Sequence, residues 1–237
     1  MTEEEWDGNQ RAPLSLFRYS AREFSARKLQ LLALGLCRLM PLVLEREWSL
    51  RALEAADDFV DEKYPTGNYA KVIDELNRLL EQIERAHEPD EPDHPDILRA
   101  RVIRAACATS NLYQSIPTLI HSVRFHLLAS LRPTSKICHL IREMVSFPLG
   151  AYRRSMVPGP YPQIGFYGPR TGFFYPSTEI INIATGIDQC RGFDRLPILA
   201  DALEDSGFAD EKILAHFRNG KEHLRGCWAL DLILGKS

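Results

Sequence analysis

Apolar side chains recur at helical spacing along most of the chain. The clearest stripe follows the spacing i, i+3, i+4, i+7 and i+11, and it consists of Ile116, Leu119, Ile120, Val123 and Leu127. One face of an α-helix produces this spacing, and similar stripes recur within residues 72–83, 137–144, 180–187 and 196–203. No stretch long enough for a β-strand shows a clear alternation of apolar and polar residues. The sequence therefore predicts an all-α fold, a multi-helix bundle of about eight to ten helices.

Residues with helix-capping chemistry indicate where these helices begin and end. Thr2 and Glu5 have the spacing of a capping box, in which each side chain satisfies a backbone amide of the other residue. Three further N-caps are predicted at Ser177, Asp194 and Asp210, and Gly207 is predicted to end a helix at the C′ position. The last helix is expected over residues 221–234.

The segment 147–176 differs in character from the rest of the chain. Proline, glycine and aromatic residues replace the helical spacing there, which predicts a long irregular loop that packs down on the helices. A short hairpin is possible around Gly168-Pro169-Arg170. The expected organisation is therefore a helical body over residues 1–146, this loop over 147–176, and a C-terminal helical subdomain over 177–237 that packs on the body.

Charge is divided unevenly along the chain. Residues 45–96 hold 16 acidic and 6 basic side chains, whereas residues 97–178 hold 10 basic side chains and one acid, Glu143. The simplest interpretation is that the acidic and basic blocks pair within the fold or cover separate solvated faces. The alternative is a basic surface for nucleic acid or another anionic partner. Its candidate residues are Arg99, Arg101, Arg104, Arg124, Arg132, Lys136, Arg142, Arg153, Arg154 and Arg170.

Composition limits the class of protein. The 237 residues are 45% hydrophobic and carry a net charge of −3, which is typical of a globular chain without general affinity for polyanions. The apolar stretch 29–44 is shorter than the roughly 20 residues of a membrane helix and is interrupted by polar residues and Pro41. Five scattered cysteines without a CxxC pair, and no signal peptide, favour reduced thiols in the cytoplasm and no membrane association.

The best candidate for a metal site lies near the C-terminus. His223 and Cys227 are four residues apart, so on one helix they would share a face, and this is a spacing that zinc ligand pairs use. His216 precedes the turn at Gly220 and could join them. Only three ligands are visible, and the competing interpretation is a small core thiol with two histidines near helix ends.

Catalytic motifs and cofactor-binding motifs are absent from the sequence. The favoured function is therefore a non-catalytic cytoplasmic interaction or regulatory module whose partner is another protein, with no cofactor. The alternatives are binding of nucleic acid or an anionic partner through residues 97–178, and a metal-dependent enzyme or metal-binding protein built on His216, His223 and Cys227. The sequence leaves the oligomeric state open.

The C-terminal run that begins at Phe193, FDRLPILADALEDSGFADEKILAHFRNGKEHLRGCWALDLILGKS, resembles a family expanded in planctomycete bacteria. The opening MTEEEW and the residues around Leu140-Ile141-Arg142-Glu143 are similar to that family's N-terminal and central landmarks. The resemblance implies a helical protein but no activity. Members of the family tend to have a cysteine where this chain has Phe217. The resemblance therefore weighs against a metal site in this chain.

Overall fold

The computed structural model describes residues 1–61, 67–86, 95–107, 112–126, 133–146, 152–157, 163–168, 172–219 and 222–236. Two compact units can be distinguished by the contacts within them. Unit 1 comprises residues 1–8, 20–23 and 142–237, and unit 2 comprises residues 9–19 and 24–141. The predicted hairpin segment around Gly168-Pro169-Arg170 lies partly outside the described residues.

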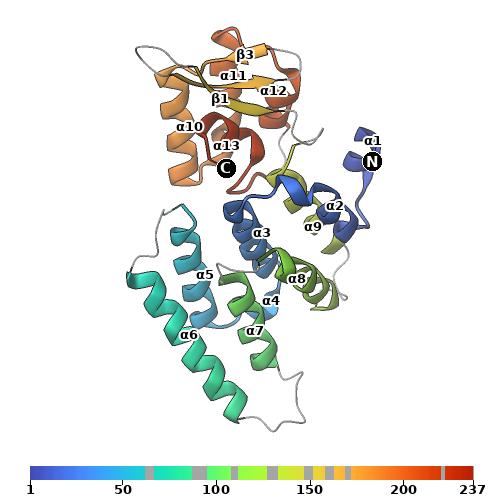
Figure 1. Cartoon of the computed structure of the whole chain (residues 1–237), viewed down its shortest axis with the longest axis vertical. Helices are drawn as coiled ribbons and strands as arrows, with labels where there is room; N and C mark the ends of the chain where they lie inside the picture. The colour runs from blue at the N-terminus through green and yellow to red at the C-terminus, as the bar shows by residue number, and fades with distance from the viewer. Residues whose placement is uncertain are drawn as a thin grey trace. The chain divides into compact units, whose positions relative to one another are not determined.

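Unit 2 is a helical bundle that contains a largely buried helix, α3 (Figure 1). The unit contains α2 (Pro13–Ser20), α3 (Ala26–Arg38), α4 (Pro41–Leu44), α5 (Glu47–Phe59), α6 (Gly67–Ala86), α7 (Pro95–Cys107), α8 (Leu112–His126) and α9 (Pro133–Met144) up to Ile141. Helix α3 packs against α5, α7 and α8. The apolar stretch 29–44 is not one continuous helix, because α3 ends at Arg38 and Pro41 begins the separate short helix α4.

The helices of unit 1 enclose a separate hydrophobic core. They are α1 (Glu3–Gly8), the 3₁₀ turns η1 (Ala21–Glu23) and η2 (Phe193–Arg195), α10 (Thr178–Cys190), α11 (Leu196–Asp205), α12 (Glu211–Arg218) and α13 (Trp228–Leu234), together with the last residues of α9. The core consists mainly of apolar residues from α10 to α13. The predicted all-α architecture is thus confirmed for both units.

A small antiparallel sheet lies where the sequence predicts an irregular loop. Strands β1 (Arg153–Val157), β2 (Gln163–Gly168) and β3 (Gly172–Phe174) form a sheet in the order β1-β2-β3, beside the α10–α13 helices of unit 1 (Figure 1). Phe166 in β2 is buried and packs its ring against Phe208 at a centroid distance of 5.7 Å. The sheet is therefore part of the unit 1 core.

Glycine obscures the strand pattern of β2. A Cβ atom at Gly165 would lie 2.5 Å from the carbonyl oxygen of Phe174 and from the ring of Phe173, so only glycine fits. The strand therefore requires a glycine between Ile164 and Phe166, and glycine is one of the residues whose abundance in 147–176 predicts a loop. The β2 and β3 strands pair with Gly168 opposite Gly172, which agrees with a hairpin at the predicted place.

Most of the predicted helix boundaries are confirmed. Thr2 and Glu5 exchange the capping-box bonds, at 2.7 and 3.1 Å. Ser177 and Asp210 cap α10 and α12, and Gly207 follows α11 with a φ of 86°. Asp194 is not an N-cap as predicted, since it lies inside η2 and the N-cap position of α11 is Arg195.

None of the helices that the structure describes is long and apolar enough to cross a membrane.

Candidate metal centre

His216 is positioned by α12, a helix with a well-defined start. The Asp210 carboxylate accepts hydrogen bonds from the backbone N–H groups of Lys212 and Ile213, at 3.0 and 3.2 Å. These bonds satisfy amides that have no partner within the helix, and the carboxylate also favours the positive end of the helix dipole. Six residues later, His216 lies in the last turn, with only 12% of its side chain exposed. The helix therefore holds the imidazole at the edge of the core.

A tight turn, and not a helix, brings Cys227 into the site. The backbone N–H of Cys227 donates to the carbonyl of Leu224 at 3.0 Å, and Gly226 adopts a φ of 87°, which favours glycine. Cys227 is then the N-cap residue of α13, and its side chain is fully buried. The prediction that His223 and Cys227 share a face of one helix is wrong, because residues 222–227 precede α13 and are not helical.

The fourth member of the cluster is Glu143, which the sequence does not single out as a ligand. It lies in the last turn of α9, 80 residues before His223, and it is 3% exposed. One signal was available, since Glu143 is the only acidic residue among residues 97–178 and stands on the same helix as the apolar stripe of Ile137, Leu140, Ile141 and Met144. A single carboxylate on a buried face requires a polar partner, but the sequence does not say which one.

The four side chains converge closely. One potential ligand atom from each of Glu143, His216, His223 and Cys227 lies within 4.8 Å of the others. His216 Nε2 is 3.1 Å from Cys227 Sγ and 3.8 Å from Glu143 Oε2, and His223 Nδ1 is 3.1 Å from the same Glu143 oxygen. All four residues belong to unit 1.

These distances can be compared with the geometry of a zinc site. Zinc bonds of about 2.0–2.3 Å in a tetrahedron place neighbouring ligand atoms about 3.3–3.8 Å apart. The separations of 3.1 and 3.8 Å in the cluster lie within a few tenths of an ångström of that range. Two imidazoles, a thiol and a carboxylate are also a donor set that Zn²⁺ accepts. These three separations fit a metal ion, whereas the remaining ones, which reach at most 4.8 Å, would have to close by up to about an ångström.

The cluster buries a thiol beside a carboxylate, and a bound cation would favour the thiolate form. Burial, and after it the negative charge of Glu143, raise the pKa of the Cys227 thiol, while the backbone N–H groups of Leu230 and Ala229 lower it by a smaller amount. The Nε2 atom of His223 is buried and has no hydrogen-bond partner among the described residues. This nitrogen lies on the opposite side of the ring from the Nδ1 atom that meets Glu143, so it does not bear on the contacts within the cluster.

Aromatic rings surround the site. The centroid of the His216 ring lies 4.9 Å from that of His223, 5.1 Å from that of Trp228 and 6.0 Å from that of Phe217. The Trp228 ring in turn contacts Tyr152, whose hydroxyl donates to Asp210. These rings lower the local dielectric constant beside His216, which strengthens electrostatic interactions there.

The structure also places the basic residues that the sequence groups together. Arg99, on α7 in unit 2, is buried, and its guanidinium donates to the carbonyl of Leu42 at 2.6 Å and to Asp96 and Glu45. Arg142, in unit 1, donates to the carbonyl of Trp6 at 2.7 and 2.8 Å. Both arginines therefore serve contacts inside their own unit.

The remaining candidates are only partly described. Arg101, Arg104, Arg124 and Lys136 are exposed on the helices of unit 2. The backbones of Arg153 and Arg154 form part of β1, whereas Arg132 and Arg170 lie outside the described residues. A shared basic surface for nucleic acid stays a prediction.

No protein-family model, curated protein or solved structure matches this chain in the comparisons. The resemblance of the C-terminal run to a planctomycete family therefore stays a prediction, and the site is interpreted from its own geometry.

Proposed function

We propose that this chain binds one transition-metal ion, and that Zn²⁺ is the ion its donor set suits best. The observation that carries the proposal is the convergence of Glu143, His216, His223 and Cys227 on one point, with ligand atoms within 4.8 Å of one another. Thiolate and imidazole donors favour Zn²⁺ over the hard cations Mg²⁺ and Ca²⁺, which prefer oxygen ligands. The lone cysteine and lone carboxylate make a mixed set that zinc tolerates.

The proposed role of the metal is structural. Zinc sites with four protein ligands are closed, whereas catalytic sites keep one position for water or substrate. Three of the four side chains are buried and the fourth is mostly buried. A bound ion would tie together the end of α9, the end of α12 and the segment before α13, all of which belong to unit 1. Its free energy of binding would add to the stability of this unit.

The competing interpretation is a buried hydrogen-bonded cluster that holds no metal. In that case Glu143 pairs with His223, His216 pairs with Cys227, and loss of any member costs stability whether or not metal is supplied. The two interpretations differ in metal content. The proposal predicts one zinc ion per chain in protein reconstituted with Zn²⁺ and freed of excess metal, measured by elemental analysis.

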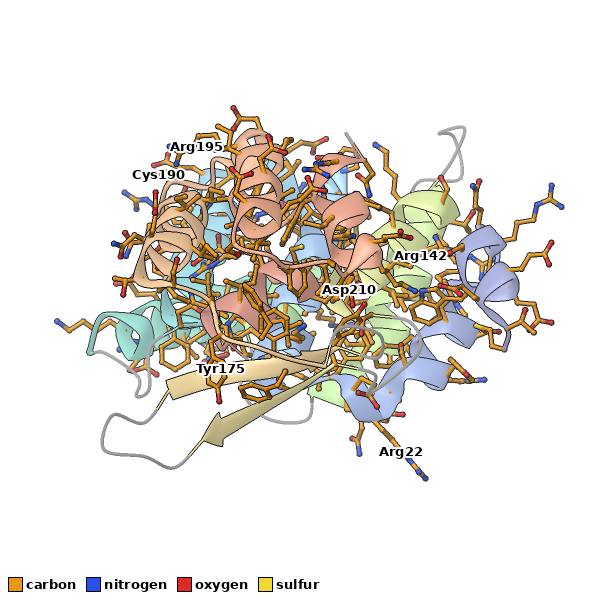
Figure 2. The ribbon with its side chains drawn as sticks, turned by 90° about the horizontal axis from the view of Figure 1, so that it is seen from above. Arg22, Arg142, Tyr175, Cys190, Arg195 and Asp210 are labelled. Atoms are coloured by element: carbon orange, nitrogen blue, oxygen red, sulfur yellow. The ribbon has the colours of Figure 1, made fainter. Side chains whose placement is uncertain are left out.

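A matched pair of variants makes this measurement specific. Cys227→Ala removes a buried proposed ligand, whereas Cys190→Ala removes an exposed cysteine on α10 (Figure 2). We expect the zinc content to fall well below one per chain in Cys227→Ala and to stay at one in Cys190→Ala. His216→Ala serves as a second ligand variant, and circular dichroism checks that each variant is folded. Equal zinc content in both cysteine variants, or none in the unmodified chain, would reject the proposal.

The function favoured by the sequence, an interaction or regulatory module with a protein partner, stays a prediction. A zinc-stabilised unit is compatible with it, because structural zinc commonly supports small binding domains. Its test is recovery of a defined complex from the native cell. The nucleic-acid alternative predicts binding that weakens steeply as salt concentration rises, and absence of binding at low salt would reject it.

A further inference from the structure

The small sheet of unit 1 has one face that packs on the core of the unit. Phe166 of β2 and Phe174 of β3 are paired across the ladder, and their rings lie 5.7 and 4.7 Å from the ring of Phe208. Residues paired directly across an antiparallel ladder share a face, and successive residues of a strand alternate between faces. The next pair, Tyr167 and Phe173, therefore holds positions on the opposite face, which we call the outer face.

Aromatic rings cover part of the outer face. A Cβ atom at Gly165 would lie 2.5 Å from the ring of Phe173, so this ring rests directly on the backbone of β2. Tyr175, two residues after Phe173, packs its ring edge-on against it at a centroid distance of 4.5 Å (Figure 2). Phe173 is half-buried, whereas Tyr175 is 40% exposed. The two rings therefore form an aromatic surface that is supported by the strand beneath it and is accessible at Tyr175.

The segment that carries this surface is basic. The sequence has no acidic residue from 144 to 178, and it holds three arginines there, Arg153, Arg154 and Arg170. Arg153 is paired with Tyr167 in the register of β1 and β2, so it holds a position on the outer face. Exposed aromatic rings beside positive charge suit a ligand that combines flat rings with negative charge. Nucleic acid with unpaired bases has both properties.

We propose that the outer face of this sheet binds single-stranded nucleic acid, with bases stacked on Tyr175 and Phe173 and a phosphate attracted by Arg153. Every base has a flat π face, so stacking on aromatic side chains tolerates any sequence. A duplex keeps its bases inside the helix and offers phosphates alone. The outer face should therefore prefer a single strand to a duplex of the same length. The proposal does not rest on the metal centre, since zinc content and oligonucleotide binding are measured separately and either can fail alone.

The test uses a fluorescein-labelled uridine oligonucleotide of about ten nucleotides, a length within the range that single-strand-binding domains cover. The full chain is titrated into it at about 50 mM salt, and binding is followed by fluorescence anisotropy. We expect a Kd on the order of 10 µM, as for binding without sequence preference. An RNA duplex of the same length should bind at least about fivefold more weakly. Poly-glutamate, which has negative charge but no rings, should not displace the oligonucleotide.

Variants of exposed tyrosines test the stacking. Tyr175→Ala removes the accessible ring and should weaken binding about fivefold or more. Tyr175→Phe keeps the ring and should bind within about twofold of the unmodified chain. The matched control is Tyr113→Ala, which removes a 47% exposed tyrosine from α8 in unit 2 and should leave Kd unchanged. Circular dichroism checks that each variant is folded.

The salt dependence of binding tests the charge. Arg153→Gln should reduce the slope of log K against log salt concentration by about 0.7, the contribution of one phosphate contact on a single strand. Arg104→Gln removes an exposed arginine from α7 in unit 2 and should leave the slope unchanged. This pair separates the sheet from the basic residues of the unit 2 helices.

Four results would overturn the proposal. They are equal binding of single strand and duplex, displacement by poly-glutamate, an effect of Tyr113→Ala as large as that of Tyr175→Ala, and no anisotropy change up to about 500 µM protein at low salt. The first two would indicate attraction by charge alone, and the third would place the binding surface outside the sheet.

Discussion

The Nδ1 atom of His223 lies 3.1 Å from the Oε2 atom of Glu143, although 80 residues separate them in the sequence. Both side chains are only 4% exposed. The contact joins the last turn of α9 to the segment before α13, and it places the carboxylate beside the imidazole of His216 and within reach of the Cys227 thiol. A pair this far apart in sequence is brought together by the tertiary fold of unit 1, so the integrity of that unit and the metal site should depend on each other.

Chelation should therefore destabilise unit 1. A ligand that binds only the folded state contributes about 2.7 kcal/mol when its free concentration is 100 times its Kd. We expect EDTA to lower the melting temperature of the transition that involves unit 1, measured by differential scanning calorimetry on the zinc-loaded chain. The Cys227→Ala variant should melt alike with and without EDTA. Identical traces for the unmodified chain would contradict a structural metal.

Arg99 should matter for stability more than for binding of an anionic partner. Arg99→Ala removes donors to the Leu42 carbonyl and to Asp96 and Glu45 from the interior of unit 2, which should cost about 2–3 kcal/mol in urea unfolding. Arg104→Ala removes an exposed arginine of the same helix and should change stability by less than about 0.5 kcal/mol. Similar effects of the two variants would show that the buried contacts contribute little.

The cap of α12 supports the metal site from a distance. Asp210→Ala should destabilise unit 1 by about 1–2 kcal/mol, because two backbone amides and the Tyr152 hydroxyl lose their acceptor. Asp210→Asn keeps an acceptor oxygen and should recover most of this loss in thermal unfolding. If Asp210→Asn were as unstable as Asp210→Ala, the capping bonds would not be the cause.

The five cysteines should differ widely in reactivity. Cys190 is exposed, whereas burial raises the pKa of Cys107 to about 12 and raises that of Cys37 even further. Burial therefore keeps both side chains in the thiol form, whereas the thiolate is the form that reacts. We expect Ellman's reagent to modify one thiol per native chain quickly, and none quickly in Cys190→Ser. Rapid reaction of several thiols at neutral pH would mean that the cores open easily.

Much of the helical architecture can be predicted from the sequence because its signals are local. The capping pairs at Thr2–Glu5 and Asp210–Ile213 depend on residues only three positions apart, and Gly207 is recognised by its own conformational freedom. Signals of this kind remain visible without knowledge of the tertiary fold. Asp194 shows the limit of local capping signals. Like Asp210, it is an aspartate that precedes an apolar helical stripe, but it lies inside the 3₁₀ turn η2 and caps no helix.

The candidate site is only partly predictable, for a physical reason. The sequence suggests His223 and Cys227 from a helical spacing that does not exist, and His216 from its place before the turn at Gly220. The two residues precede α13 in a non-helical segment, and a turn at Gly226 positions Cys227 instead. Glu143 is missed because its approach to His223 depends on the packing of distant segments. The sheet is missed because the high proline, glycine and aromatic content of residues 147–176 is typical of an irregular loop.

The most direct test of the central claim is the absorption spectrum of the chain loaded with Co²⁺ in place of Zn²⁺. One tetrahedral ion bound by Glu143, His216, His223 and Cys227 should give intense visible d–d bands and a near-ultraviolet thiolate-to-cobalt charge-transfer band, at one equivalent per chain. The charge-transfer band should vanish in Cys227→Ala and persist in Cys190→Ala. Weak bands typical of octahedral cobalt, or a charge-transfer band that survives in Cys227→Ala, would contradict the account.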